Sequence, residues 1–381
     1  MKTLSKNTGK LLRGIPDHYR FRHNATYIRY NNMISFYPGP SRIHDEIPQY
    51  VQDAATSGIL SANHRSPAFV ELSKEVIGLL KAKLGVPDNY TVFFTSSATE
   101  CWEIIAQSLV QSGSTHIFNG AFGQKWFDYT SRIRNAEPWS FDIEQATETK
   151  VPDHLLRDVL CLTQNETSNG TQVTDNALAL IRKVNPDAII AVDATSSIGG
   201  ITLSFENADV WFGSVQKCFG LPAGLGIMIC SPRAIARALE INETAHYNSI
   251  TFMKKMMDSW QTSYTPNVLG IYLLMRVLKD SKKIQKVHDK LYTRYERWMD
   301  FLSRAKSIRH LVKNQSVHSF TVLPVSGDPE LIKRLKSDAR EKGLLLGEGY
   351  GQWKESTFRI ANFPALKKDE ISELMRFLKK Y

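Results

Sequence analysis

Two apolar runs in the middle of the chain each end at residues that could do chemistry. The first, AIIAV, leads into Asp193, and the second, VWFGSV, is followed by Gln216 and Lys217. The first run contains no polar residue, which is typical of strands that helices cover on both faces. In open α/β sheets, ligands bind beyond the carboxyl ends of the strands. We therefore expect Asp193 and Lys217 to face one crevice and to reach one ligand.

This acid and amine suit the chemistry of pyridoxal phosphate. That cofactor needs a lysine amine to condense with its aldehyde, and a carboxylate at its pyridine nitrogen to keep the ring protonated as an electron sink. Taken singly, an Asp after a strand is more often a helix N-cap, and a Lys there is usually solvated. The Ser-Val-Gln leader before Lys217 and the glycine-rich run FGLPAGLG after it favour the cofactor interpretation.

The residues around this pair resemble the core of the class V aminotransferases of fold type I. The resemblance rests on Asp193 with Ser196-Ser197, and on the run Ser214-Val-Gln-Lys217. Three further stretches match the family in order: PGPSRIHDEI from Pro38, HRSPAFVEL from His64 and NETSNG from Asn165. Each motif is modest alone, but their order and spacing favour the family, and its phosphoserine aminotransferase branch is the nearest.

The resemblance extends from about Phe36 to about Ala365 and implies an α/β fold in two parts. Residues 36–269 would form a large cofactor-binding domain with a mostly parallel sheet. Residues 270–381 would form a smaller α+β C-terminal domain, in which helical patterns flank strands at HSFTVLPV and TFRIAN. Residues 1–35 are polar and aromatic without clear periodicity, and we expect them to form an arm that packs on the small domain or on a partner.

A small-residue turn between a strand and a helix, in TVFFTSSATECWEIIAQSL, is a candidate phosphate site. Such a turn leaves backbone N–H groups free at a helix N-terminus, where they can bind phosphate without positive side chains. The candidates are Ser97, Ala98 and Thr99. Small residues in this position are also often no more than helix caps.

The resemblance assigns further cofactor contacts. Phe122 stands where the family stacks an aromatic ring on the cofactor, unless the nearby Trp126 takes that role. Thr167 matches a hydroxyl that bonds the ring oxygen, and Gln216 accompanies the lysine. Thr265 matches a hydroxyl donated to the cofactor phosphate of the other subunit, which implies a homodimer with shared sites. Without the family, these residues would be taken as core, turn and cap residues.

Three residues are assigned to the substrate in the same way. Arg359 matches the arginine that grips the α-carboxylate, a task for which a planar two-donor fork is well suited. His64 and Arg65 match a pair that reaches the substrate phosphate across the dimer interface. An arginine at a helix start opposes the helix dipole unless an anion is nearby, which also favours this role over a plain surface arginine.

The chain departs from the phosphoserine branch shortly before Arg359. The branch typically has a second His-Arg pair there, whereas this chain has Gln352 and Trp353. Lys354 could restore the charge as a point donor, which would leave phosphoserine as the amino donor. If Trp353 fills the pocket instead, a smaller or more apolar amino acid would be preferred.

The resulting prediction is a pyridoxal-phosphate aminotransferase, most simply a phosphoserine:2-oxoglutarate enzyme of serine biosynthesis. Lys217 would hold the cofactor and move the substrate proton, and Asp193 would tune the ring. The first alternative is a class V aminotransferase for serine or alanine, with pyruvate or glyoxylate. A cysteine desulfurase needs a late nucleophilic cysteine, and no Cys follows Cys230. A non-catalytic nucleic-acid binder fits the charge but not the retained lysine, aspartate and arginine.

Composition limits the remaining classes. The 381 residues suffice for a large core, and no apolar run reaches the length of a membrane span. Four scattered cysteines without a C-x-x-C pair argue against a disulfide framework or a zinc site and favour a reducing cytoplasm. The net charge of +10 is spread along the chain, so we expect no nucleic-acid partner but a potential that attracts dianionic substrates.

Overall fold

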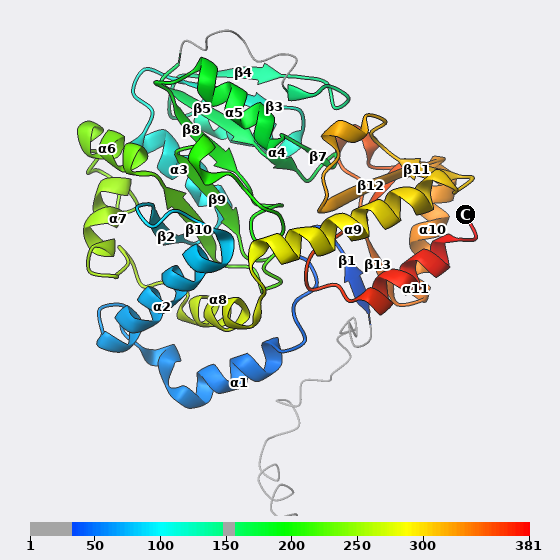
Figure 1. Ribbon diagram of the computed structural model, residues 1–381, viewed down its shortest axis with the longest axis horizontal. Coiled ribbons are helices and arrows are strands. Elements are labelled where there is room, and N and C mark those ends of the chain that lie inside the picture. The colour runs from blue at the N-terminus through cyan, green and yellow to red at the C-terminus, as the bar shows by residue number, and fades with distance from the viewer. Residues whose placement is uncertain (1–32, 148–156) are drawn as a thin grey trace, which may run out of the picture. The chain divides into compact units, whose positions relative to one another are not determined.

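The computed structural model describes residues 33–147 and 157–381, and two main sheets organise them (Figure 1). The seven-stranded sheet has the order β2-β10-β9-β8-β5-β3-β4. Strand β10 is antiparallel to both of its neighbours, and the other adjacent pairs are parallel. Its strands are β2 (Thr91–Thr95), β3 (Ser114–Phe118), β4 (Ala136–Ser140), β5 (Val159–Thr163), β8 (Ile189–Asp193), β9 (Val210–Ser214) and β10 (Gly226–Cys230). The predicted α/β fold class is confirmed.

The apolar runs that predicted strands form the centre of this sheet. AIIAV becomes β8, VWFGSV becomes β9 and the following apolar segment becomes β10, and every residue of these strands is buried. Strands buried along their whole length are covered on both faces. The helices that share the hydrophobic core of this sheet are α1 (Ile47–Ser57), α2 (Pro67–Leu84), α3 (Ala98–Ser108), α4 (Ala121–Thr130), α5 (Asp175–Val184), α6 (Pro232–Ile241), α7 (Ile250–Met257) and α8 (Val268–Asp280).

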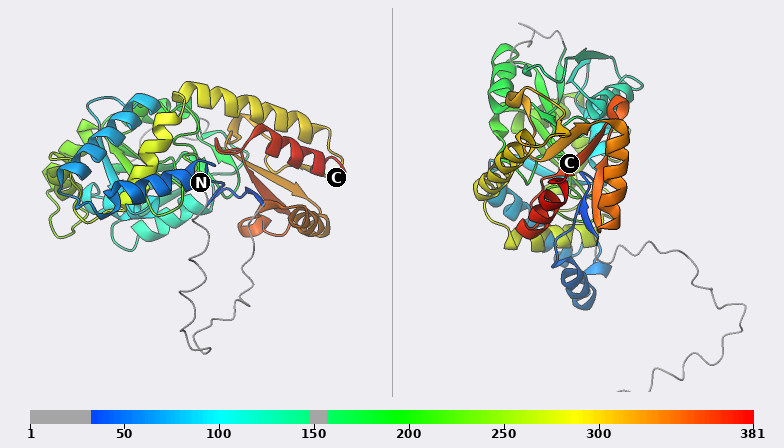
Figure 2. Two further views of the ribbon diagram at one scale, coloured as in Figure 1. Left: turned by 90° about the horizontal axis from the view of Figure 1, so that it is seen from below. Right: turned by 90° about the vertical axis from the view of Figure 1, so that its right-hand side faces the viewer.

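The second sheet has five strands in the order β1-β13-β14-β12-β11. Its first strand pairs in parallel with β13, although the two lie near opposite ends of the described chain. Figure 2 (left) shows α9 and α11 on one side of this sheet and α10 on the other. The elements are β1 (Ile34–Phe36), β11 (Ile308–His310), β12 (Val322–Gly327), β13 (Leu344–Glu348), β14 (Thr357–Ala361), α9 (Ile284–Ser303), α10 (Pro329–Glu341) and α11 (Lys368–Leu378).

Each sheet has its own hydrophobic core. Helix α8 packs into the core of the first sheet, and α9 carries Trp298 and Leu302 into the core of the second. The domain division near residue 269 stays a prediction. Short elements complete the described chain: β6 (Asn165–Glu166), β7 (Thr171–Gln172), and the 3₁₀ turns η2 (Ile59–Ser61), η4 (Phe205–Asn207), η5 (Gln315–Val317) and η6 (Gly351–Trp353).

The predicted N-terminal arm lies mostly outside the described residues, since residues 1–32 are not among them. Ile34 and Ser35, at the end of that arm, belong to β1. Among the described helices, none combines the length and the apolar character that crossing a bilayer would require.

Candidate active site

A cavity of about 450 Å³ lies at the carboxyl ends of β8 and β9, and residues associated with both sheets line it. From the first come Asp193 and Lys217, and from the second come Tyr350 and Arg359. The segment Pro38–Pro40, which follows β1, forms another part of the wall. Asp193 and Lys217 thus face one cavity, as expected from the sequence.

Lys217 is a buried amine held by two hydroxyl groups. The residue is only 7 % exposed, and its Nζ donates to Thr167 Oγ1 and Ser196 Oγ, both at 2.8 Å. Burial lowers the pKa of Lys217 to about 8, and the carboxylates of Asp193 and Glu166 limit the fall. Much of the amine is thus neutral and nucleophilic in slightly basic solution, where an ordinary lysine is charged.

The approach to Lys217 depends on a glycine. Gly39 has φ +148°, and a Cβ there would lie 2.9 Å from Lys217 Cε. The turn around Gly39 is tied to the lysine turn, because the backbone N–H and the hydroxyl of Ser41 both donate to the carbonyl of Gln216. The cavity wall and the lysine are therefore positioned together.

Asp193 ends β8 and is 5 % exposed. Its Oδ1 accepts the backbone N–H of Thr195 at 2.9 Å. Burial raises the pKa of this carboxyl, while hydrogen bonds from Thr195 and the charge of Lys217 act in the opposite direction. A buried carboxyl in this place can bond strongly to a protonated ring nitrogen, because the low dielectric strengthens such a pair.

Arg359, in β14, brings a positive charge to the cavity without a carboxylate partner among the described residues. Its Nε donates to the carbonyl of Glu348 at 2.7 Å, and Nη1 donates to the carbonyl of Thr167 at 2.8 Å. Burial lowers the pKa of this guanidinium. Two backbone carbonyls thus orient the fork and leave its charge available to a ligand carboxylate.

The predicted phosphate turn precedes α3. Ser97 caps the helix by accepting from the backbone N–H of Glu100, and Ala98 and Thr99 line the cavity. The backbone N–H of Ala98 donates to Ser214 Oγ at 2.8 Å, so this donor already has a partner within the chain. The role of all three residues in phosphate binding stays a prediction.

Of the two aromatic candidates, Phe122 is the one that reaches the cavity. Its ring centre lies 5.4 Å from Lys217 Nζ. Trp126 is buried in the core, where it stacks on Trp102 and meets Phe212 edge to face. A ring beside the amine can cover one face of a flat ligand bound there.

Comparison with known proteins identifies the family. The model of the class-V aminotransferases matches residues 131–335, more than half of the chain. The chain belongs to this family. A crystal structure of phosphoserine aminotransferase from Cytophaga hutchinsonii is 32% identical, with a TM-score of 0.86 over 92% of this chain and 99% of that chain. Phosphoserine aminotransferase from Corynebacterium glutamicum is 24% identical over 88% of this chain and 91% of its own length.

A more distant aminotransferase shares the fold alone. Aspartate aminotransferase from Thermus thermophilus is 19% identical, with a TM-score of 0.79 over 91% of this chain and 97% of that chain.

Five of the predicted site residues do not line the cavity of their own chain. They are Ser97, His64, Arg65, Thr265 and Lys354. His64 and Thr265 are neighbours, with Nδ1 and Oγ1 3.4 Å apart, while Arg65 and Lys354 are exposed. The cavity takes in Gln216, whose buried Oε1 has no partner among the described residues. The roles of His64, Arg65 and Thr265, and the homodimer in which they would act, stay predictions.

Sequence reasoning missed Glu166, which positions α4. Its carboxylate accepts the backbone N–H groups of Phe122 and Gly123, both at 3.1 Å, and it is 1 % exposed. A Cβ at Gly120 would lie 2.3 Å from Glu166 Cγ, so the glycine makes this cap possible. The sequence gives little indication of this contact, because β4 and β5 separate α4 from Glu166 along the chain.

Sequence reasoning also missed a lysine and a tyrosine at the mouth of the cavity. Lys125, on α4, donates from Nζ to Tyr350 Oη at 2.6 Å, and both residues line the cavity. Lys125 stands one helical turn after Phe122, and that spacing could have suggested that both side chains share a helix face.

Proposed function

We propose that this class-V aminotransferase uses pyridoxal phosphate and takes phosphoserine as its amino donor and 2-oxoglutarate as its acceptor. The observation that carries the proposal is the buried, two-hydroxyl-held amine of Lys217 in a cavity that also contains Asp193 and Arg359. An amine, a carboxylate and an arginine are the groups needed for a carbonyl cofactor, its ring nitrogen and a substrate carboxylate.

The residues present fit the cofactor. Thr163 Oγ1 and Gln216 Oε1 are buried in the cavity wall without partners in the described chain, which indicates that a polar ligand completes them. Lys217 would hold the group through its amine, Asp193 would bond the ring nitrogen, and Phe122 would cover one face. The N-terminus of α3 would meet the phosphate. The cofactor supplies an electron sink that stabilises negative charge at the substrate Cα.

The chain's own groups would then orient the substrate and move its proton. Arg359 would bind the α-carboxylate with its guanidinium, whose position two backbone carbonyls fix. Lys217 Nζ is the base beside Cα, and its lowered pKa of about 8 keeps a useful fraction neutral. Thr167 and Ser196 hold that amine in place, so that it can return the proton as an acid.

The donor is inferred from the relatives and from the chain's motifs. The solved relative at 32% identity and the curated relative at 24% identity both carry the name phosphoserine aminotransferase. His64 and Arg65 match the phosphate-binding pair of that branch. Because these two residues and Thr265 lie outside their own cavity, we propose a homodimer in which each subunit completes the other's site. A cytoplasmic location stays a prediction.

A panel of half-reactions tests the donor. Phosphoserine, serine and alanine are added separately to the cofactor-loaded protein, and the loss of its visible absorbance is followed. We expect the highest rate at low concentration with phosphoserine, and no reaction in Lys217→Ala. Faster reaction with serine or alanine would overturn the donor and favour the alternative aminotransferase. Transamination by Lys217→Ala would overturn the assignment of the lysine.

A further inference from the structure

We propose that Lys125, held by Tyr350, binds the acidic group at the far end of the substrate, whether the phosphate of the donor or the distal carboxylate of the 2-oxo acid. The inference rests on the proposed function in one respect, namely that the substrate occupies the cavity around Lys217. The residues that the sequence assigns to this end of the substrate, His64, Arg65 and Lys354, do not line the cavity of their own chain.

The position of Lys125 is fixed from two sides. Glu166 binds the first N–H groups of α4, which sets the direction of the helix into the cavity. Three residues after Phe122, Lys125 donates to Tyr350 Oη at 2.6 Å. The Phe122 and Tyr350 rings lie 5.5 Å apart, and Lys125 Nζ lies 5.5 Å from the first ring centre and 5.3 Å from the second. Two rings and one hydroxyl thus hold this amine at the cavity mouth.

Counting the charges in the cavity assigns the role. Three cations line it, namely Lys217, Lys125 and Arg359. The proposed function uses Lys217 for the proton and Arg359 for the α-carboxylate, and it brings His64 and Arg65 to the donor phosphate from a second subunit. Lys125 is the remaining cation that its own chain supplies, so it would share the distal acidic group with that pair. Within the described chain no carboxylate lies within ion-pair distance of its Nζ. An ammonium that donates once to a neutral phenol keeps two N–H groups for a second acidic group of the ligand.

The ring of Tyr350 lies close to both Arg359 and Lys125. Its ring centre lies 5.4 Å from the guanidinium carbon of Arg359 and 5.3 Å from Lys125 Nζ. An amino acid with acidic groups at both ends can therefore meet Arg359 with one end and Lys125 with the other. Lys354, the candidate from the sequence, is exposed and does not line the cavity.

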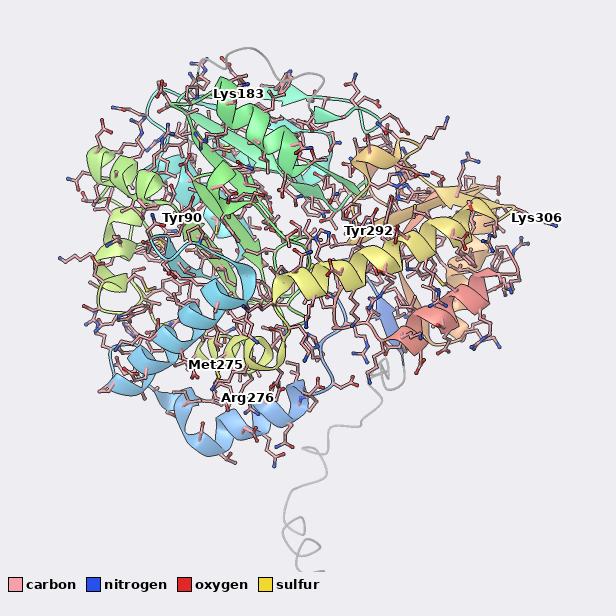
Figure 3. The ribbon with its side chains drawn as sticks, in the orientation of Figure 1. Tyr90, Lys183, Met275, Arg276, Tyr292 and Lys306 are labelled. Atoms are coloured by element: carbon pink, nitrogen blue, oxygen red, sulfur yellow. The ribbon has the colours of Figure 1, made fainter. Side chains whose placement is uncertain are left out.

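The test compares donors that differ only in the distal charge. Half-reaction kcat/KM is measured for glutamate against glutamine and for phosphoserine against serine, in wild type, Lys125→Met, Lys125→Arg and Lys354→Met. Lys183→Met is the matched control, because this exposed lysine lies in the last turn of α5 and does not line the cavity (Figure 3). The rise in melting temperature caused by glutarate is measured in the same variants as a readout of binding alone.

Loss of a charge-assisted contact is expected to lower the acidic-to-neutral ratio about ten- to a hundredfold in Lys125→Met. Lys125→Arg should keep most of the ratio, Lys183→Met all of it, and the glutarate effect should shrink in Lys125→Met only. An unchanged ratio in Lys125→Met, or an equal loss in Lys354→Met, would overturn the inference. If phosphoserine proves not to be a donor, the glutamate-to-glutamine ratio still decides the role of Lys125, so the two proposals fail separately.

Discussion

Lys217 combines a buried position with hydrogen bonds to neutral groups only. Thr167 and Ser196 accept from its Nζ but bring no charge, and the carboxylates of Asp193 and Glu166 act from further away. The ammonium form is therefore poorly compensated, which explains why burial dominates and the pKa of Lys217 falls to about 8. The same feature that destabilises the charged lysine in the folded protein makes its amine reactive.

This lowered pKa predicts a pH-dependent stability. Between the folded pKa of about 8 and the ordinary 10.5, the unfolded chain binds more protons than the folded one, so the stability of the wild type rises with pH in that window. At pH 7 the buried ammonium costs about 3 kcal/mol. Lys217→Met should therefore stabilise the cofactor-free protein in urea unfolding at pH 7, and by clearly less near pH 10. A gain that stays constant or grows with pH would contradict this account.

The identities of the central residues could be predicted from the sequence, but their surroundings could not. Asp193, Lys217 and Arg359 follow from strand ends and from motifs, and all three line one cavity. Glu166 and Lys125 depend on how α4 is placed against other elements. Local sequence patterns do not contain that information, because the partners of both residues lie far along the chain.

At the scale of elements, close packing at the start of α3 positions the predicted phosphate turn. Gly226 opens β10, which pairs with β2 and β9. A Cβ at Gly226 would lie 2.4 Å from Thr95 Oγ1 and 2.6 Å from the carbonyl carbon of Ser97, the N-cap of α3. Because the second of these atoms belongs to the backbone, it cannot move aside by a change of rotamer.

Gly226→Ala is therefore expected to destabilise the protein by about 1–3 kcal/mol and to weaken cofactor binding, since it displaces the start of α3. Gly78→Ala is the matched control. Gly78 lies inside α2, and an added Cβ there would meet nothing within 4 Å, so this change should stabilise by up to about 1 kcal/mol. Melting temperatures report the change in stability, and cofactor dissociation constants report the change in binding. A Gly226→Ala protein that binds the cofactor as tightly as wild type would show that this contact does not position the turn.

Strands β8 and β9 were predictable from the sequence because their apolar runs are too short for most helices and are followed by glycine-containing turns. The pairing of β1 with β13 was not, since the three residues of β1 carry no signal of their partner. The helix over 67–84 was predictable from Ser66-Pro67 and its periodic apolar residues, and Ser66 does cap it by accepting from Phe69 N.

At the scale of the whole molecule, the segment after β1 links the two sheets and forms part of the cavity wall. Ser41 bonds to the lysine turn, and Arg42 donates to Glu370 of α11 at 2.8 Å. Lys367 forms an ion pair with Asp45 from the same part of the chain. The two sheets are thus connected beside the site by polar contacts, and Phe320 packs against both hydrophobic cores.

The proposed homodimer predicts complementation between two inactive variants. Lys217→Ala removes the base, and Thr265→Glu places a negative charge where the cofactor phosphate of the other subunit would lie. A mixed dimer then holds one doubly damaged site and one intact site, so random reassortment should restore about a quarter of wild-type activity. Activity no higher than in either parent would show that Thr265 acts within its own chain.

The pairing of β1 with β13 also has a consequence for the order of events during synthesis. The strand that leads into Pro38–Pro40 is made early, but its hydrogen-bonding partner, Leu344–Glu348, is made close to the end. All strands of the seven-stranded sheet leave the ribosome in between, and domains generally fold as they emerge. A nascent chain stopped before β13 is therefore expected to hold a formed first sheet, with Asp193 and Lys217 in position. The cavity wall at Pro38–Pro40 would still lack the strand that pairs with β1.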